Sequence, residues 1–199
     1  MATAHENVGL AWLLSAGGLV GLVASATLLI EKIELLANPD YVPSCSINPI
    51  LSCGSIMRTS QAEVFGFPNP ILGVVGFAVV VTVGVSLLAG VAYPKRFWLG
   101  LQAGATLGFV FVHWLIYQSL YRIGALCPYC MVVWCVTAAI FWYVTLHNLR
   151  TGDATRRRFT GRVVRVGAEF HAVVLTGWVL VVAGLITVRF WDYWSTLLR

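Results

Sequence analysis

The sequence predicts an all-α integral membrane protein, in which a four-helix bundle is joined by a fifth transmembrane helix. Three observations support this fold class. Of the 199 residues, 59% are hydrophobic and only 11% are charged, whereas soluble domains carry about a quarter charged residues. The mean hydropathy is +0.83. The apolar residues gather in five runs that approach the roughly 20 residues of a spanning helix, and we expect them to form a single membrane domain, 1–199.

The first apolar run, from Val8 to Ile30, contains no charged residue. As a helix it would rise about 35 Å, enough to cross a hydrocarbon core of about 30 Å with some tilt. The sequence before and after it lacks the basic start and the small-residue cleavage pattern of a signal peptide. We therefore expect this span to remain in the mature protein.

Four more apolar runs follow, each bounded by charged, proline or aromatic residues. They cover 70–93, 97–121, 125–146 and the slightly shorter 172–188. Two long connections join the runs. An outward loop, 37–68, lies between the first and second runs, and a basic loop, 147–169, lies between the fourth and fifth. Glycines at four-residue spacing predict close helix approach in two of the spans, and they are Gly17 and Gly21 in the first and Gly100, Gly104 and Gly108 in the third.

The positions of the 13 Lys and Arg residues predict the orientation of the chain. Placing the N-terminus in the cytoplasm puts most of them on the cytoplasmic side, including a dense run from Arg150 to Arg165, as the positive-inside rule requires. The loop 37–68 then faces outward from a bacterial inner or plasma membrane. Because the basic residues lie between apolar runs rather than along one face, we expect contact with membrane lipid and no nucleic-acid partner.

Four cysteines are expected at this outer face. Cys45 and Cys53 lie in the outward loop, and Cys127 and Cys130 form a Cys-Pro-Tyr-Cys motif where the fourth span begins. Two thiols three residues apart on the first turn of a helix lie on one side, close enough to bond. The helix N-terminus also favours a thiolate, which is the attacking species in disulfide exchange. The pattern predicts a redox-active centre.

Other uses of these cysteines stay open. They could form two structural disulfides, or a zinc site with four thiolates, although the spacing of Cys45 and Cys53 is too wide for an ordinary zinc pair, and we expect no metal. The fifth cysteine, Cys135, is expected to pack in the core as a small hydrophobe.

The residues around the cysteines resemble the vitamin K epoxide reductases and their bacterial homologues. The resemblance extends over about 8–149, and the fifth span is similar to the extra helix of bacterial members. Three motifs carry it, and they are Cys45-Ser-Ile-Asn-Pro-Ile-Leu-Ser-Cys53, Phe67-Pro-Asn69-Pro-Ile-Leu-Gly and Cys127-Pro-Tyr-Cys130.

The resemblance implies a bundle around a quinone, either menaquinone or ubiquinone, and a separate thioredoxin-fold thiol oxidase in the periplasm or another extracytoplasmic space. In the implied relay, Cys45 exchanges with that partner and Cys53 passes electrons to Cys127. Cys130 would be the thiolate nearest the quinone. The implied function is to reoxidise the partner by disulfide exchange and to reduce the quinone by two electrons, which supports disulfide formation in exported proteins.

Four further residues are expected to contact the quinone. Asn69 matches the family's Asn that hydrogen-bonds a quinone carbonyl, and the alternative is a turn residue between two prolines. Trp134 stands where the human-type enzyme has a Tyr, and an indole can wall the ring and donate one hydrogen bond. The amphipathic segment 54–65 is expected to cap the pocket through Met57 and Phe65, or else to touch lipid alone.

Four other functions remain open at this point, and the least specific of them is a structural membrane scaffold. The nearest is a quinone or quinone-epoxide reductase driven by a dithiol donor. A metal-binding membrane protein would use the same four outward thiols as ligands and would not be an enzyme. A quinone-linked haem protein would need a second histidine at the depth of His113, and His147 lies nearer the inner face.

Overall fold

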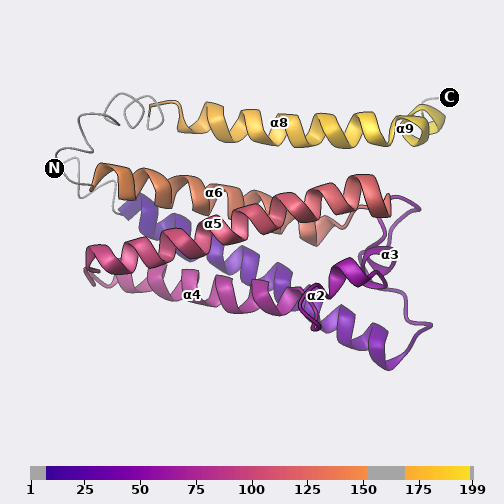
Figure 1. Ribbon diagram of the computed structural model, residues 1–199, viewed down its shortest axis with the longest axis horizontal. Helices are drawn as coiled ribbons and strands as arrows, with labels where there is room; N and C mark the ends of the chain where they lie inside the picture. The colour runs from indigo at the N-terminus through magenta and orange to yellow at the C-terminus, as the bar shows by residue number, and fades with distance from the viewer. Residues whose placement is uncertain (1–7, 152–168, 198–199) are drawn as a thin grey trace. The chain divides into compact units, whose positions relative to one another are not determined.

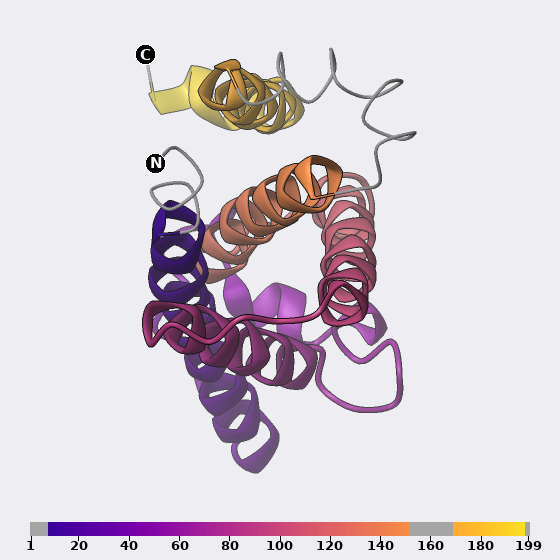
Figure 2. The ribbon, with the colours of Figure 1, turned by 90° about the vertical axis from the view of Figure 1, so that its left-hand side faces the viewer.

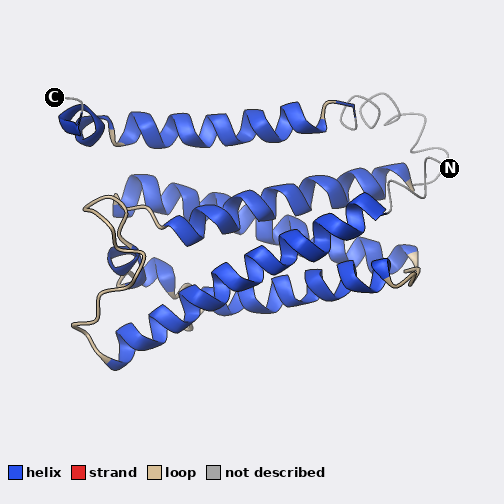
Figure 3. Cartoon of the chain, turned by 180° about the vertical axis from the view of Figure 1, so that it is seen from behind, coloured by secondary structure: helices blue, strands red, loops and turns tan. Residues whose placement is uncertain are grey.

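The computed structural model describes residues 8–151 and 169–197. Within these ranges the chain is helical, and it contains no strand, only one isolated β-bridge (Figure 3). The chain divides into two compact units, Met1–Val144 and Thr145–Arg199. Most of the predicted basic loop, 152–168, lies outside the described residues.

Five helices in the described ranges are long and apolar enough to cross a membrane, which confirms the predicted number of spans. They cover Val8–Ala37, Pro70–Leu88, Lys95–Ile123, Pro128–Arg150 and His171–Arg189. The first comprises a π-helical stretch, Leu13–Gly17, and α2, Gly18–Ala37; α4 is Pro70–Leu88; α5, Lys95–Tyr117, runs into a second π-helical stretch, Gln118–Ile123; and α6 is Pro128–Arg150.

In the first unit, α2, α4, α5 and α6 stand around the four sides of a bundle (Figure 2). Small residues bring α2 and α4 together, because a Cβ added at Gly21 would lie 2.5 Å from the ring of Phe77. The glycine prediction is thus confirmed at Gly21. It is wrong for Gly100 and Gly104 in α5, which have open space beside them and line a cavity instead.

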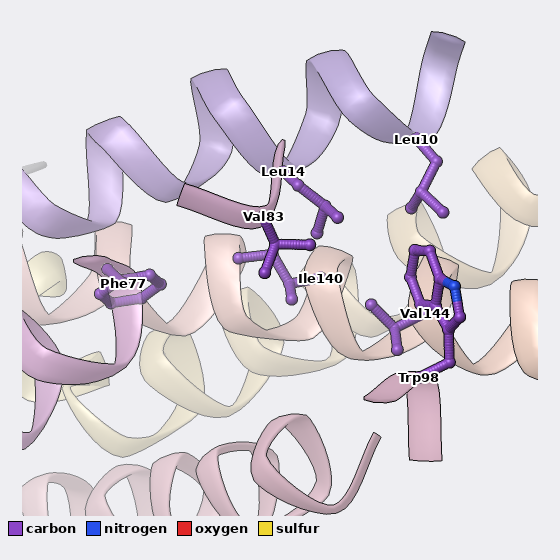
Figure 4. Packing of buried hydrophobic residues seen from close by; sticks show 7 residues of the cluster. All are labelled: Leu10, Leu14, Phe77, Val83, Trp98, Ile140 and Val144. Carbon is purple, nitrogen blue, oxygen red and sulfur yellow. The ribbon is translucent and has the colours of Figure 1, made fainter. Parts of the chain in front are cut away.

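An apolar core fills one end of this bundle (Figure 4). Its buried residues come from the first helix, α4, α5 and α6, and they are Leu10, Leu14, Phe77, Val83, Trp98, Ile140 and Val144. We call this group the inner core. Close packing of apolar side chains holds the four helices in register at this end.

The opposite end carries the loop between α2 and α4. Sequence reasoning ended the first span at Ile30, whereas the helix continues to Ala37. The extension includes two buried charged residues, Glu31 and Lys32. Hydropathy predicts that the span ends at the first charged residue. The helix continues beyond that point because both charged side chains find partners in the loop.

The region of the predicted amphipathic segment 54–65 contains two short helices. They are α3, Cys53–Met57, and a 3-10 turn, Ser60–Ala62. Ser52 caps α3 by accepting a hydrogen bond from the backbone N–H of Ser55. Figures 1 and 2 show α3 at the end of the bundle, in line with its centre.

The second unit contains α8, His171–Arg189, and α9, Trp191–Leu197. The helix α8 corresponds to the predicted fifth span and extends it by one residue at each end. Sequence reasoning did not foresee α9, which follows directly and carries mixed aromatic and polar residues.

Candidate active site

A disulfide joins the two loop cysteines. Cys45 lies in the loop after α2 and Cys53 begins α3, with their Cα atoms 5.6 Å apart. Both side chains are buried, and only 4% of Cys45 is exposed. The outward loop pair expected from the sequence is therefore a closed and shielded disulfide.

Backbone pairing brings this disulfide against the start of α6. Leu51 and Leu126 form a parallel β-bridge. The N–H of Ser52 donates to the carbonyl of Leu126 at 2.9 Å, and the N–H of Leu126 donates to the carbonyl of Ile50 at 2.7 Å. These bonds fix the residue before Cys53 beside the residue before Cys127.

As a result, the two cysteine pairs meet at a single short contact. The Sγ atoms of Cys53 and Cys127 lie 3.0 Å apart, and Cys127 is buried. Cys127 and Cys130 are free thiols here. A Cys127 thiolate could attack Cys53, form a Cys53–Cys127 disulfide and release Cys45, which is one step of disulfide exchange.

The surroundings of Cys127 favour its thiolate. The hydrogen bond from the Cys130 thiol lowers the pKa of Cys127 and, with the backbone N–H groups of Tyr129 and Cys130, outweighs the effect of burial. The N–H of Cys130 lies 3.4 Å from the Cys127 sulfur. Because thiolates attack and leave in exchange reactions, Cys127 is suited to both roles.

A cavity of about 600 Å³ lies inside the first unit, between the four bundle helices. Three cysteines line one end of this cavity, and they are Cys53, Cys127 and Cys130. The remaining lining is mostly apolar and includes the glycine stripe of α5. Without Cβ atoms at these glycines, the wall leaves room for a flat ring.

Trp134 supplies an unsatisfied hydrogen-bond donor at this cavity. Its side chain lines the cavity and is only 2% exposed, yet its Nε1–H has no hydrogen-bond partner. Such a buried donor costs about 1–3 kcal/mol while unpaired. A ligand with a carbonyl oxygen would satisfy it, so this residue fits the bound quinone that the sequence suggests.

The other three expected quinone contacts differ in position. Met57 is buried and lines the cavity. Asn69 also lines it, but its Oδ1 accepts from the N–H of Val64 at 3.1 Å and its Nδ2 donates to the carbonyl of Gln61 at 2.7 Å. The Asn69 amide thus also holds the loop, as the turn interpretation expects, and keeps one N–H for a ligand.

Phe65 lies farther out. It is 59% exposed, and its ring packs on Phe67 and Phe111 with centroids 6.1 and 6.0 Å away. Phe65 is not among the residues that line the cavity, whereas Phe111 is. Any effect of Phe65 on a ligand would pass through Phe111.

Two site residues were missed by sequence reasoning. Glu31 and Lys32, at the end of the first span, are both hydrogen-bonded to the loop that carries Cys45 and Cys53. A pair of opposite charges directly after an apolar run could have pointed to them, because charges at that depth need partners.

The prediction for the fifth cysteine was wrong. Cys135 is exposed on α6 and is not packed in the core.

Three sulfur atoms lie close enough together to suggest a metal site. The ligand atoms of Cys45, Cys53 and Cys127 lie within 4.8 Å of one another. Two of these sulfurs are bonded to each other, however, and a disulfide has no thiolate to offer a metal. The arrangement suits exchange between sulfurs.

The arrangement of helices and cysteines corresponds to that of a known protein family. The model of the vitamin K epoxide reductase family matches residues 12–145. This range includes both cysteine pairs, all of α2, α4 and α5, and most of α6. The chain belongs to the vitamin K epoxide reductase family. A search of curated proteins gave no significant match.

Membership confirms the resemblance seen in the sequence. The vitamin K epoxide reductase family consists of membrane proteins with an all-α fold, typically oxidoreductases associated with quinones, and it generally works with a thioredoxin-like partner. The five apolar helices and the linked cysteines agree with a multi-pass membrane oxidoreductase.

Proposed function

We propose that this protein is a quinone-dependent thiol oxidoreductase. It would reoxidise a separate thioredoxin-fold protein by disulfide exchange and pass two electrons to a membrane quinone, supporting disulfide formation in exported proteins. The observation that carries the proposal is the unbroken series of sulfurs, in which the Cys45–Cys53 disulfide lies 3.0 Å from Cys127 and the Cys127–Cys130 pair lines the cavity.

The first half of the reaction occurs at the loop pair. A thiolate of the reduced partner attacks the Cys45 sulfur, and Cys53 leaves as a thiolate with the electron pair of the broken bond. The partner's second thiolate then attacks the mixed disulfide, so the partner departs oxidised and Cys45 becomes a thiolate. Two electrons now reside on the loop pair.

The second half moves these electrons inward. Cys53 thiolate attacks the sulfur of Cys127 in a Cys127–Cys130 disulfide, and Cys130 leaves as a thiolate. Cys45 thiolate then attacks Cys53, which re-forms the loop disulfide and releases Cys127. The structure has this product arrangement, with a closed loop disulfide and two free thiols at the cavity. The lowered pKa of Cys127 favours its departure as a thiolate.

Residues of this chain would hold the acceptor in place. A bound menaquinone or ubiquinone supplies a two-electron acceptor whose carbonyl oxygens take hydrogen bonds. Trp134 Nε1 would donate one such bond from α6, and the remaining N–H of Asn69 would donate another. Met57, which is buried and lines the cavity, would help to exclude water.

The distribution of Lys and Arg supports a cytoplasmic N-terminus, with all four cysteines on the outer face. A soluble partner would then meet Cys45 from the extracytoplasmic side. Labelling of single-cysteine variants with a membrane-impermeant maleimide tests this placement. Cys45 and Cys127 labelled from opposite sides of the membrane would exclude the relay.

Replacing Cys130 tests the direction and the acceptor together. In Cys130→Ala the chain should lose quinone reduction by a reduced thioredoxin-fold donor, while Cys45 still forms a mixed disulfide with that donor. Quinone absorbance follows the first activity, and mass spectrometry of the covalent adduct follows the second. Quinone-coupled turnover that persists in Cys130→Ala would refute the assignment.

A further inference from the structure

Two adjacent residues of opposite charge follow the apolar run of the first helix, and both are buried. Glu31 is 6% exposed and Lys32 is 5% exposed. Buried charges are costly unless they are paired and hydrogen-bonded, so their partners indicate what they do. Those partners lie on two different parts of the cysteine loop.

Lys32 holds the part that carries Cys53. Its Nζ donates to the carbonyl of Met57 at 2.7 Å and pairs with Oε1 of Glu63 at 2.8 Å. Met57 is the last residue of α3, and Cys53 is the first. Because a short helix moves as a unit, fixing Met57 also fixes Cys53 beside Cys127.

Glu31 holds the part that precedes Cys45. Its Oε2 accepts hydrogen bonds from the hydroxyl of Tyr41 at 2.9 Å and from the N–H of Ser44 at 3.2 Å, and its Oε1 accepts from the Ser44 hydroxyl. We call these bonds the Glu31 clasp. Tyr41 packs against the cluster that contains the loop disulfide.

The clasp has a direct consequence for chemistry at Cys45. An attacking thiolate must reach the sulfur atom itself, and Cys45 is buried while the clasp is closed. The two cysteines of the loop therefore have opposite requirements. Cys53 must stay fixed to exchange with Cys127, whereas the cover over Cys45 must lift to admit a soluble protein.

The partners of the two charges suit these requirements. Lys32 forms an ion pair with the Glu63 carboxylate in addition to its hydrogen bond to a carbonyl, so two opposite charges hold this contact. Glu31 bonds to neutral hydroxyl and amide groups, which water can replace when residues 41–44 move outward. The attachment at Glu31 is thus the one that opens more easily.

We propose that Glu31 and Lys32 are positioning residues with separate tasks: Lys32 keeps Cys53 against Cys127, and the Glu31 clasp controls access of the partner to Cys45. The proposal rests on the proposed function for the need of a soluble partner. In the open state, a partner thiolate attacks Cys45, the Cys45–Cys53 bond breaks, and Cys53 keeps the electron pair while Lys32 still holds it at Cys127.

The first experiment measures reduction of the loop disulfide in the full-length protein in lipid nanodiscs. A reduced thioredoxin serves as the protein reductant, and alkylation with mass spectrometry reports free Cys45. Glu31→Gln should be reduced faster, on the order of tenfold, since it loses charge-assisted hydrogen bonds. Glu34→Gln, an exposed carboxylate on the same helix, should react like the wild type. An unchanged or slower rate in Glu31→Gln would overturn the gating role.

The second experiment measures how closely Cys53 is held to Cys127. In a Cys45→Ala/Cys130→Ala background, mild oxidation joins the two remaining site cysteines, and peptide mapping measures the rate. Lys32→Met should slow this cross-link roughly tenfold, and Lys32→Arg should restore it. Equal rates in Lys32→Met and the background would contradict the role of Lys32.

General loosening of the loop would produce a different pattern. It would both speed reduction and slow cross-linking in each variant, whereas separate tasks require that Glu31→Gln leave the cross-linking rate unchanged. Neither assay uses a quinone. Failure here therefore leaves the proposed function standing, while absent quinone reduction in the wild type removes the proposed function and leaves these two results valid.

Discussion

The two ends of the bundle are built in different ways, although the first helix contributes to both. The inner core consists of hydrophobic side chains without a charged residue. The outer cluster contains Leu28, Leu35 and Met57 together with Cys45, Cys53 and Cys127, and two buried charges lie beside it. One end is held by packing, which is non-directional, and the other by hydrogen bonds and sulfur contacts, which fix particular atoms.

The difference shows how a membrane protein can rearrange disulfides at one end of a bundle while its fold stays intact. Rearranging disulfides requires loop atoms to move, and the packed inner core is not part of that movement. Stability and reactivity should therefore respond to different substitutions. Three experiments test this separation, from the largest expected effect to the smallest.

The first prediction concerns the inner core. Leu14 is fully buried, so Leu14→Ala leaves a cavity and should lower the free energy of unfolding by roughly 2–5 kcal/mol. Unfolding in mixed micelles measures the loss. Leu107→Ala, at a position on α5 that is 72% exposed, is the matched control and should differ little. If Leu14→Ala also slowed loop-disulfide reduction in the folded protein, the two ends would not be independent.

The second prediction concerns the pH dependence of Cys127. The hydrogen bond from Cys130 lowers the pKa of Cys127, so its thiolate is present at lower pH than for an ordinary thiol. Cys130→Ala removes the donor and should move the midpoint of Cys127 alkylation to higher pH, whereas Cys130→Ser retains a hydroxyl donor and should move it less. Iodoacetamide labelling in a Cys45→Ala/Cys53→Ala background, quantified by mass spectrometry, measures both.

A midpoint in Cys130→Ala at or below that of the parent would contradict this explanation. In that case the N–H groups at the start of α6 would dominate the pKa of Cys127, and Cys130 would serve only as its redox partner.

The third prediction compares two indoles on α6 whose ring nitrogens are buried. Trp134 and Trp142 both have an Nε1–H without a hydrogen-bond partner, but only Trp134 is among the residues lining the cavity. Trp134→Phe should weaken quinone binding about fivefold, the value of one neutral hydrogen bond. Quenching of intrinsic fluorescence by a short-chain quinone measures binding. Trp142→Phe should leave it unchanged, and an equal effect of both would remove Trp134 from the quinone site.

Much of the fold followed from hydropathy. The all-α class and the number of long apolar helices are confirmed, because an uncharged run of this length has few alternatives to a helix in lipid. The errors arose where a side chain's partner is distant in the sequence. The first helix continues beyond Ile30 because Glu31 and Lys32 meet residues 41–63; the two adjacent charges indicate a need for partners, but no local pattern identifies those distant residues.

The candidate site divides in the same way. The motifs identified both cysteine pairs, and the structure brings Cys45, Cys53 and Cys127 together, although their individual roles stay predictions. The glycines of α5 show the limit of a spacing rule, since the same pattern that packs α2 against α4 opens a cavity wall in α5. Phe65 lies outside the cavity because the predicted amphipathic segment breaks into two short helices.

The sequence by itself determined a membrane protein of five spans, with two cysteine pairs and membership of a redox family, since apolar runs and short motifs are local properties. Only the tertiary structure decided which sulfurs touch, which indole lacks a partner and which charges hold the loop. The reason is physical: the 3.0 Å sulfur contact between Cys53 and Cys127 depends on backbone pairing between two segments that lie far apart in the sequence.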